Sequence, residues 1–381
     1  MELVAVKKCS SYNDYLVKRK LKELFQLLGG IEQFVSEGDS VLLKVNLLMG
    51  KSPEEAVTTH PLVVKNLADL LLKAGAGEVI IGDSPGSPFK KTILKNFYKQ
   101  SGLTGAAEAE GVKLNYDLGH KEMSWTRGKV SRSFPVCNFV QKADVIINLP
   151  KLKTHGLTRM TGAVKNIFGV VPGLIKSEYH MNMREVSLFS DMLIDLALFI
   201  DPDLNIIDGI TGMDGAGPSG GEAHDFGYLL GAESPFALDT AASYLMGIQS
   251  PDRLPMIKNA GQRGLVSRLE ELKLCGDELV PDLDTEVPPG REDTNLLENR
   301  LPDIISHFVL RLLRSHPEII KGRCVLCGAC VDSCPADTIY PEEKSVKIDY
   351  EDCIRCFCCQ EVCQYEAVRI NRSLLGRLIY E

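Results

Sequence analysis

Two cysteine runs with identical spacing restrict what this chain can fold into more than any other feature of its 381 residues. The pattern C-x2-C-x2-C-x3-C occurs at Cys324, Cys327, Cys330 and Cys334, and again at Cys353, Cys356, Cys359 and Cys363. Thiolates are soft, charged ligands that suit iron–sulfide cubes, and the short spacing lets three of them reach one cube from a single tight loop. Because the fourth ligand must then come from elsewhere, the pattern predicts two 4Fe-4S clusters within one small unit.

The fourth cysteine of each run is predicted to bind the cube of the other run, as it does in two-cluster ferredoxins. Cluster 1 is therefore assigned to Cys324, Cys327, Cys330 and Cys363, and cluster 2 to Cys353, Cys356, Cys359 and Cys334. A pair of zinc sites is the alternative, although zinc knuckles favour two separated Cys pairs. Pro335 follows the first run, as is usual in bacterial ferredoxins, whereas Gln364 follows the second and is expected to alter the local turn.

Nine of the twelve cysteines lie in the last sixty residues, which favours metal clusters in a reducing compartment over a disulfide framework. Of these nine, Cys358 lies between predicted ligands and is expected to be a spare thiol without a role. The other three, Cys9, Cys137 and Cys275, have no metal-like spacing and are predicted to be small core residues.

The composition is that of a folded protein, since apolar residues make up 44% of the chain and charged residues 25%. A net charge of -8 and the lack of a Lys/Arg stripe argue against nucleic acid as a partner. The N-terminus lacks the pattern of a secretion signal. The most apolar stretch, 192–200, is short and interrupted by Asp195, so no membrane span is expected. These features predict a soluble, cytoplasmic protein.

The first 250 residues alternate strand-like apolar runs with helical periodicity, which indicates a parallel α/β sheet. Strands are predicted at 40–46, 78–82, 112–117, 144–149 and 204–208, and helices between Thr59 and Gly75, at 188–200 and around 301–313. The expected organisation is a layered α/β domain with a mainly parallel sheet at 1–250, a loop-rich extension with a connecting helix at 251–316, a small α+β ferredoxin-like domain at 317–373 and a tail at 374–381.

Three stretches that follow predicted strands are candidates for a binding site, because ligands of open parallel sheets bind beyond the carboxyl ends of the strands. They are 82–88, 150–166 and 208–221. Asp83 and Ser84 in the first stretch are predicted to bind a substrate or a metal, with a tight turn as the alternative. The third stretch is rich in glycine but lacks the sequence of a nucleotide-binding loop, and a flexible lid is the alternative there.

The second stretch concentrates positive charge at the end of a strand. Its cations are Lys151, Lys153, His155, Arg159 and Lys165. So many neighbouring cations repel one another unless an anion or carboxylates lie among them, although surface solvation explains each one taken alone. We therefore predict that Lys151 and Lys153 bind an anionic substrate, and that His155 and Lys165 are acid–base residues.

Two aspartates of the third stretch are expected to balance these lysines across a crevice. Asp208, at the end of a predicted strand, is the third predicted catalytic residue. Asp214, six residues further along the chain, is predicted to contribute to binding.

These residues resemble the domain of unknown function 362 family, whose members are often fused to a two-cluster ferredoxin. The likeness runs from the strand at 41 through 82–85, 150–155, 161–166, 208–209 and 215–218 to the cysteine runs, and so covers most of the chain. The family name carries no established general reaction. A fainter similarity in His155, Lys165 and Pro172-Gly173 links the chain to the nickel-dependent lactate racemase family, where a histidine and a lysine surround a nickel-pincer nucleotide. This analogy concerns the fold and does not predict nickel.

An iron–sulfur oxidoreductase is the leading hypothesis, with clusters that exchange electrons with an anionic substrate or cofactor held by the α/β domain. Fusion of the two parts keeps donor and acceptor at high effective concentration. The alternatives are an electron carrier or metal-cofactor assembly scaffold without its own substrate, and a racemase or isomerase with structural clusters. A redox partner protein or a small-molecule electron donor or acceptor is implied. No flavin motif is visible, and a further cofactor in the α/β domain is left open.

Overall fold

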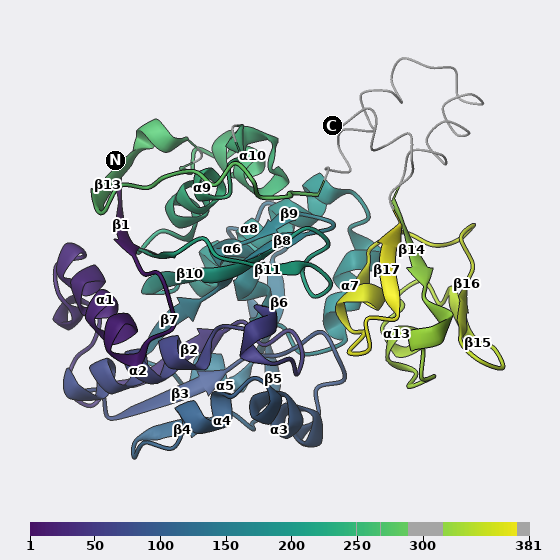
Figure 1. Cartoon of the computed structure of the whole chain (residues 1–381), viewed down its shortest axis with the longest axis horizontal. Helices are drawn as coiled ribbons and strands as arrows, with labels where there is room; N and C mark the ends of the chain where they lie inside the picture. The colour runs from purple at the N-terminus through teal and green to yellow at the C-terminus, as the bar shows by residue number, and fades with distance from the viewer. Residues whose placement is uncertain (249, 267, 289–314, 372–381) are drawn as a thin grey trace.

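The computed structural model describes residues 1–248, 250–266, 268–288 and 315–371. A large α/β domain is followed by a smaller C-terminal domain that lies at one end of it, at the right of the view (Figure 1). The sheet of the large domain is mostly parallel and the small domain combines short strands with short helices, so the predicted fold class is confirmed. The helix predicted around 301–313 and the tail at 374–381 lie outside the described residues.

The main sheet has the strand order β13-β1-β12-β10-β7-β2-β3-β4. These strands are β1 (Glu2–Lys8), β2 (Ser40–Val45), β3 (Glu78–Gly82), β4 (Val112–Leu114), β7 (Val145–Leu149), β10 (Leu204–Asp214), β12 (Tyr228–Ala232) and β13 (Leu272–Gly276). The neighbours β10, β7, β2, β3 and β4 are parallel, whereas β12 runs antiparallel to β1 and β10. Three strands attach beside β10: β8 (Lys151–His155), β9 (Arg159–Thr161) and β11 (Glu222–His224). A separate hairpin pairs β5 (His120–Ser124) with β6 (Ser133–Cys137).

Helices cover both faces of this sheet (Figure 1). They are α1 (Asp14–Leu27), α2 (Pro61–Lys73), α3 (Lys91–Gln100), α4 (Leu103–Ala106), α5 (Asn138–Gln141), α6 (Ala163–Asn166), α7 (Ile175–Asn182), α8 (Val186–Ile200), α9 (Pro235–Leu245) and α10 (Pro255–Gln262). Helix α2 shows how local sequence sets such bounds. His60 caps its start by accepting a hydrogen bond from the backbone N–H of Leu62, Pro61 suits the first turn, and the chain leaves the helix at Gly75 with φ +111°.

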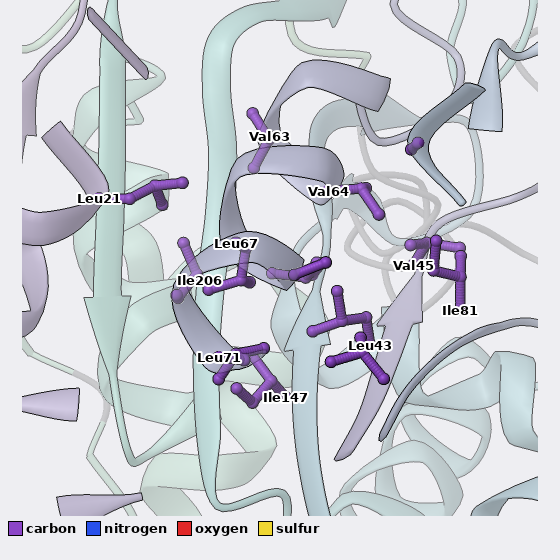
Figure 2. Packing of buried hydrophobic residues seen from close by; sticks show 14 of the residues in the cluster. Leu21, Leu43, Val45, Val63, Val64, Leu67, Leu71, Ile81, Ile147 and Ile206 are labelled. Atoms are coloured by element: carbon purple, nitrogen blue, oxygen red, sulfur yellow. The ribbon is translucent and has the colours of Figure 1, made fainter. Parts of the chain in front are cut away.

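The apolar run of β2 is buried on both faces, as its sequence predicted. Val41 and Leu43 face a core shared with α1 and α2, whereas Leu42 faces a second core shared with α8. Figure 2 shows α2 with Leu67 and Leu71 packed close to Leu43 and Ile147. A strand in this position reads as a continuous hydrophobic segment because helices cover both faces of the sheet.

Predicted and observed elements differ mainly where tertiary pairing extends a strand. Strand β10 continues past Asp208 to Asp214, because its second half pairs with β11. Strand β4 ends at Leu114 instead of residue 117. The stretch after residue 250 was expected to be loop-rich, but it contains α10 and β13, and β13 extends the main sheet by pairing with β1.

The C-terminal domain repeats one backbone path twice. Its elements are β14 (His316–Ile319), α13 (Ala329–Asp332), β15 (Ile339–Pro341), β16 (Val346–Ile348), α14 (Cys358–Glu361) and β17 (Val368–Asn371). Left-handed residues recur at equivalent places, in the pairs Leu326 and Arg355, Gly328 and Phe357, and Asp337 and Glu366. Pro335 and Gln364 occupy equivalent turn positions, so the expectation that Gln364 alters the local turn is not met. The backbone of the turn therefore does not require the proline.

We expect Leu43→Ala to lower the free energy of unfolding of the α/β domain by about 2–5 kcal/mol, because the side chain is fully buried and its removal leaves a cavity. Leu188→Ala is the matched control, since Leu188 is 38% exposed, and its effect should stay within about 0.5 kcal/mol. Chemical denaturation under nitrogen, followed by circular dichroism, measures both. Equal effects of the two substitutions would contradict the packing described here.

Candidate functional site

A cavity lies where the parallel part of the sheet changes direction. The chain runs outward from β2 through β3 to β4 and then returns to the other side of β2 at β7. The carboxyl ends of strands beside such a switch point form the usual ligand crevice of open α/β sheets. Residues just after β2 and β3, together with β8 just after β7, line a cavity of about 70 Å³.

We call this space the interdomain cavity, because both domains line it. Its polar lining from the α/β domain includes Asn46, Asp83, Ser84, Lys153, His155, Thr161, Lys165, Asn166, Lys176 and His180, and the C-terminal domain adds Cys358, Glu361 and Val362. The three predicted candidate stretches therefore contribute unequally. The structure brings the first two stretches to the cavity, and from the third only Pro218 reaches it.

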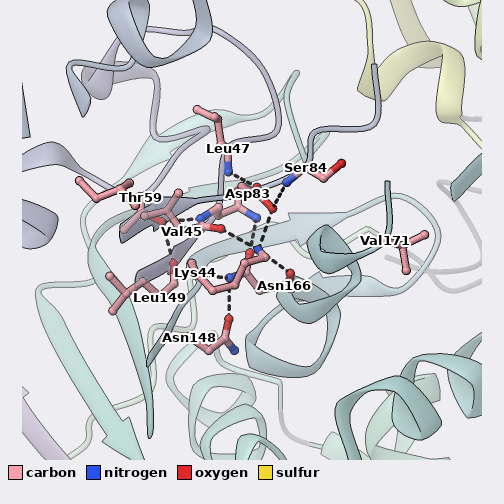
Figure 3. Close-up of polar contacts among 12 residues, drawn as sticks. Lys44, Val45, Leu47, Thr59, Asp83, Ser84, Asn148, Leu149, Asn166 and Val171 are labelled. Carbon is pink, nitrogen blue, oxygen red and sulfur yellow. Dashed lines mark hydrogen bonds and ion pairs between the residues drawn. The ribbon is translucent and has the colours of Figure 1, made fainter. Parts of the chain in front are cut away.

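A buried ion pair joins Asp83, which lines the interdomain cavity, to Lys44 on β2 (Figure 3). Lys44 Nζ lies 2.8 Å from Asp83 Oδ1, and the two side chains are 1% and 6% exposed. The ammonium also donates to the carbonyls of Val45 and Asn166, and Asp83 accepts from the backbone N–H of Leu47. Burial lowers the pKa of Lys44, while Asp83 acts in the opposite direction. Asp83, predicted to bind substrate, is thus held by protein donors and ties β2 to β3.

Hydrogen bonds between asparagine side chains link this ion pair to α6. Asn166 donates to Asn148 Oδ1 at 2.7 Å and accepts from Asn46 Nδ2 at 2.8 Å. Asn148 in turn donates to Asn205 Oδ1 at 2.8 Å and to the carbonyl of Ala163 at 3.0 Å. Because these buried side chains have hydrogen-bond partners, the network holds them in one arrangement. It fixes the short helix that carries Lys165.

Lys153 is fully buried, with 1% of its surface exposed. Its ammonium donates to Asn46 Oδ1 at 2.8 Å and to the carbonyl of Val57 at 2.7 Å. Burial, together with the charge of Lys165, lowers the pKa of Lys153 to about 7. A lysine in this environment changes charge near neutral pH.

His155 connects the two domains. Its Nδ1 accepts hydrogen bonds from the backbone N–H groups of Leu157 and Thr158, at 3.0 and 3.3 Å, so we assign its proton to Nε2. Nε2 lies 3.0 Å from Oε1 of Glu361, although off the ideal hydrogen-bond direction. Burial, together with the charge of Lys165, lowers the pKa of His155 to about 4, so the ring is neutral at pH 7. His155 therefore directs its one proton at a carboxylate of the C-terminal domain.

Two cavity residues were missed by sequence reasoning. Lys176 donates to the carbonyl of Ser84 at 2.7 Å, and burial lowers its pKa to about 8. Ser84 Oγ accepts from the backbone N–H of Gly173 at 2.7 Å. His180 follows Lys176 by four residues on α7, a spacing that places both on one helical face. That spacing was the available signal.

Three predicted site residues lie elsewhere. Lys151 and Asp208 are both 0% exposed and form an ion pair of 2.9 Å with each other, to which the hydroxyl of Tyr12 is also hydrogen-bonded. Asp214 pairs with His224 at 3.3 Å. Asp208 thus balances one of the predicted lysines, as expected, but away from the interdomain cavity, whereas the expectation that Asp214 balances a lysine is wrong. The physical reason is that β10 continues to Asp214, which leaves Asp208 in the middle of a strand.

The predicted cluster ligands form two separate groups. A cavity of about 20 Å³ is bordered by Cys324, Cys327, Cys330 and Cys363, and another of about 20 Å³ by Cys334, Cys353, Cys356 and Cys359. Each group thus takes its fourth cysteine from the other run. The sulfur of Cys363 accepts from the backbone N–H of Ala367 at 3.2 Å, and that of Cys334 from Thr338 at 3.4 Å. Such N–H···S bonds favour thiolate ligands and tune cluster potentials.

The remaining cysteines divide into two kinds. Cys9 and Cys137 are buried in the hydrophobic core and Cys275 is partly buried beside it, as predicted. Cys358, predicted to have no role, lies in the wall of the interdomain cavity. A hydrogen bond with Cys356 and burial raise the pKa of its thiol. Cys358 therefore touches both the cavity and a predicted ligand of cluster 2.

Direct contacts hold α14 against the α/β domain. Gln360 donates to the carbonyl of Ala216 at 2.9 Å, and its own carbonyl accepts from the hydroxyl of Ser219 at 3.3 Å. Phe357 is buried next to Gly156, where a Cβ would come within 3.6 Å of its ring and 2.7 Å of Ile370. A side chain at this position would displace the end of the Ile370 side chain, so the close approach of the two domains favours glycine.

The fold and the two cysteine groups define an α/β protein joined to a ferredoxin-type domain. The model of a 4Fe-4S dicluster domain matches residues 316–364, and that of a domain of unknown function, DUF362, matches residues 41–244. The chain belongs to the DUF362 family. A thylakoid-associated protein of Synechocystis sp. is 34% identical over 325 residues, which are 84% of this chain and 98% of that protein. A ferredoxin of Streptomyces griseus is 40% identical over 40 residues, which are 10% of this chain and 38% of the ferredoxin.

Two solved structures share part of the fold. The lactate racemase apoprotein of Thermoanaerobacterium thermosaccharolyticum is 14% identical with a TM-score of 0.40, over 65% of this chain and 58% of the racemase. A protein of Thermotoga maritima is 15% identical with a TM-score of 0.33, over 54% and 52%. The chain thus spans little more than half the length of either, and at these scores neither likeness bears on mechanism. Of the helices that the structure describes, none is both long and apolar enough to cross a bilayer.

We expect anion binding in the interdomain cavity to weaken as pH rises. Sulfate is a suitable probe because its charge is constant between about pH 6 and pH 9. Lys153 and Lys176, with pKa values of about 7 and about 8, lose their charges in this range. The dissociation constant should therefore rise by up to about tenfold per pH unit above each pKa. Calorimetric titration at several pH values measures the dissociation constant. Lys153→Met should abolish the loss of affinity that begins near pH 7. An affinity for sulfate that is constant or rises with pH would contradict the assignment of these lysines to anion binding.

Proposed function

We propose that the chain is an iron–sulfur oxidoreductase whose interdomain cavity holds the anionic molecule that gains or loses electrons. Two 4Fe-4S clusters, when bound in the C-terminal domain, supply one-electron transfer. The 4Fe-4S dicluster match and the two groups of four cysteines support this assignment of cofactor. We assign cluster 1 and cluster 2 to the two groups that the structure brings together.

Helix α14 is the observation that carries the proposal. Cys359 on this helix borders the cavity of cluster 2, whereas Cys358 and Glu361 border the interdomain cavity. A helix of four residues spans only about 6 Å, so the two spaces are separated by a single helical turn. A molecule in the interdomain cavity therefore lies next to the ligands of cluster 2.

The charges of the cavity support an anion as its occupant. Lys153, Lys165 and Lys176 line it, whereas its described lining holds only two carboxylates, Asp83, which is paired with Lys44, and Glu361. Buried positive charge without a partner is unfavourable, and a bound anion offsets that cost. A carrier or assembly scaffold without its own substrate does not need such a cavity, and a racemase with structural clusters does not need the cavity beside cluster 2.

Cluster 1 borders the opposite, solvent-exposed part of the domain, where we place the exchange of electrons with a redox partner. Cys327 is exposed, and the apolar side chains of Val325, Leu326 and Tyr365 beside it are 53%, 42% and 49% exposed. Exposed apolar groups around a redox centre suit transient contact with another electron-transfer protein. Cluster 1 would then face the partner and cluster 2 the substrate.

We expect Cys330→Ala to reduce the iron content of protein purified without oxygen from about eight atoms per chain to about four or fewer, because one cube loses a thiolate. Cys358→Ala should keep about eight, because Cys358 is not assigned to either cube. Iron and sulfide analysis with visible spectra measures both variants. Full iron content in Cys330→Ala, or zinc in its place, would refute the ligand assignment.

We expect small α-keto or α,β-unsaturated carboxylic acids to reoxidise the dithionite-reduced protein, and Lys165→Met to slow this reaction by about tenfold or more. Stopped-flow absorbance of the clusters measures the rate. Lys113→Met on exposed β4 is the matched control and should react like the wild type. A metal-complex oxidant should reoxidise all three proteins equally. If neither these acids nor other small anions reoxidise the wild type faster than buffer does, the proposed function is wrong.

A further inference from the structure

Lys153 and Thr161 face each other across the hairpin of β8 and β9. They are direct partners in the antiparallel register, so their Cβ atoms lie about 4.5–5.5 Å apart on one face. Lys153 is 1% exposed, Thr161 is 4% exposed, and both border the interdomain cavity. A buried ammonium and a buried hydroxyl thus lie side by side in its wall.

The hydrogen bonds of this pair are incomplete among the residues that the structure describes. An ammonium has three N–H donors, and Lys153 uses two of them, on Asn46 and Val57. The hydroxyl of Thr161 is buried and has no partner in the described part of the chain. A buried hydroxyl without a partner is unfavourable, since it has lost its water without gaining another bond. Both groups can still donate to a bound molecule.

The positive charge of neighbouring lysines indicates that the bound molecule is an anion. Lys165 lies on α6, four residues after Thr161. Within the described ranges no carboxylate lies at ion-pair distance from Lys153 or Lys165. Glu361 lies in the same lining, and although burial acts in the opposite direction, the charge of Lys165 lowers the pKa of its carboxyl group. One carboxylate thus faces two ammonium groups, which leaves a net positive charge for an anion to balance.

The available donors fit a carboxylate better than a phosphate. Phosphate sites commonly use several backbone N–H groups at the start of a helix. At the start of α6, however, the N–H groups of Ala163 and Val164 already donate to the buried carboxylate of Asp239. On the hairpin of β8 and β9, one ammonium N–H of Lys153 and the hydroxyl of Thr161 remain, enough for the two oxygens of a carboxylate.

We propose that Lys153 and Thr161 bind the carboxylate group of a small organic acid, one oxygen on each, with Lys165 balancing the charge. This inference deepens the proposed function and rests on it, because it names the substrate class of the same cavity. The cavity volume of about 70 Å³ suits a small acid. The rest of such an acid extends towards Cys358 in the opposite domain.

Calorimetric titration of the full, cluster-loaded chain with oxalate tests the proposal, with inorganic phosphate as the comparison ligand. Thr161→Val keeps the shape and removes the hydroxyl, so it should weaken oxalate binding by at least about tenfold. Thr161→Ser restores the hydroxyl and should bind within about twofold of the wild type. Thr58→Val is the matched control, because Thr58 is also buried with an unpartnered hydroxyl but does not line the cavity.

Three results would overturn the inference: no binding of oxalate by the wild type, equal affinities of Thr161→Val and Thr58→Val, or tighter binding of phosphate than of oxalate. Lys153→Met provides a second variant, expected to lose binding by at least about tenfold, and thermal denaturation confirms that each variant is folded. Binding is measured without electron transfer, so its outcome is separate from that of the proposed function. If oxalate fails to bind while other molecules reoxidise the reduced protein, only the carboxylate assignment is wrong.

Discussion

The buried ion pair between Lys44 and Asp83 is the interaction on which the arrangement of the cavity depends. Two opposite charges are buried at the carboxyl ends of β2 and β3 and lose their hydration. This loss of hydration free energy is offset only when both charged groups are fully hydrogen-bonded. They are, because backbone groups of Leu47, Val45 and Asn166 complete their coordination. The pair therefore holds three segments at the switch point of the sheet, and one of them carries Lys165.

The C-terminal domain combines internal symmetry with one departure from it. Gly328 in the first repeat adopts a left-handed conformation without steric cost, whereas Phe357 adopts the same conformation in the second repeat at a cost of roughly 1–2 kcal/mol. The ring of Phe357 is buried next to Gly156, so packing against the α/β domain offsets that cost. The second repeat is thereby turned inward and the first remains exposed. The two cysteine groups consequently have different surroundings although their spacing in the sequence is the same.

The interdomain cavity exists only because the two domains meet. Lysines from the end of one sheet face a helix that carries cysteines, and the contact of His155 with Glu361 joins the two walls. The neutral state of His155 follows from its burial beside Lys165. A charged wall and a cluster-bearing wall are thus placed together by one interface, which is the physical basis for linking anion binding with electron transfer.

Much of this protein was predictable from its sequence, because the relevant patterns are local. The cysteine spacing predicted both groups of four, and the apolar run of β2 predicted a strand buried on both faces. The same reasoning found Lys153, His155 and Lys165 near the end of a strand. Tertiary structure alone decided which charged residues share a cavity, since β10 runs on past Asp208 and pairs it with Lys151 instead. It also placed Lys176, Cys358 and Glu361 around the same cavity, because contacts between distant segments are not encoded in the local sequence pattern.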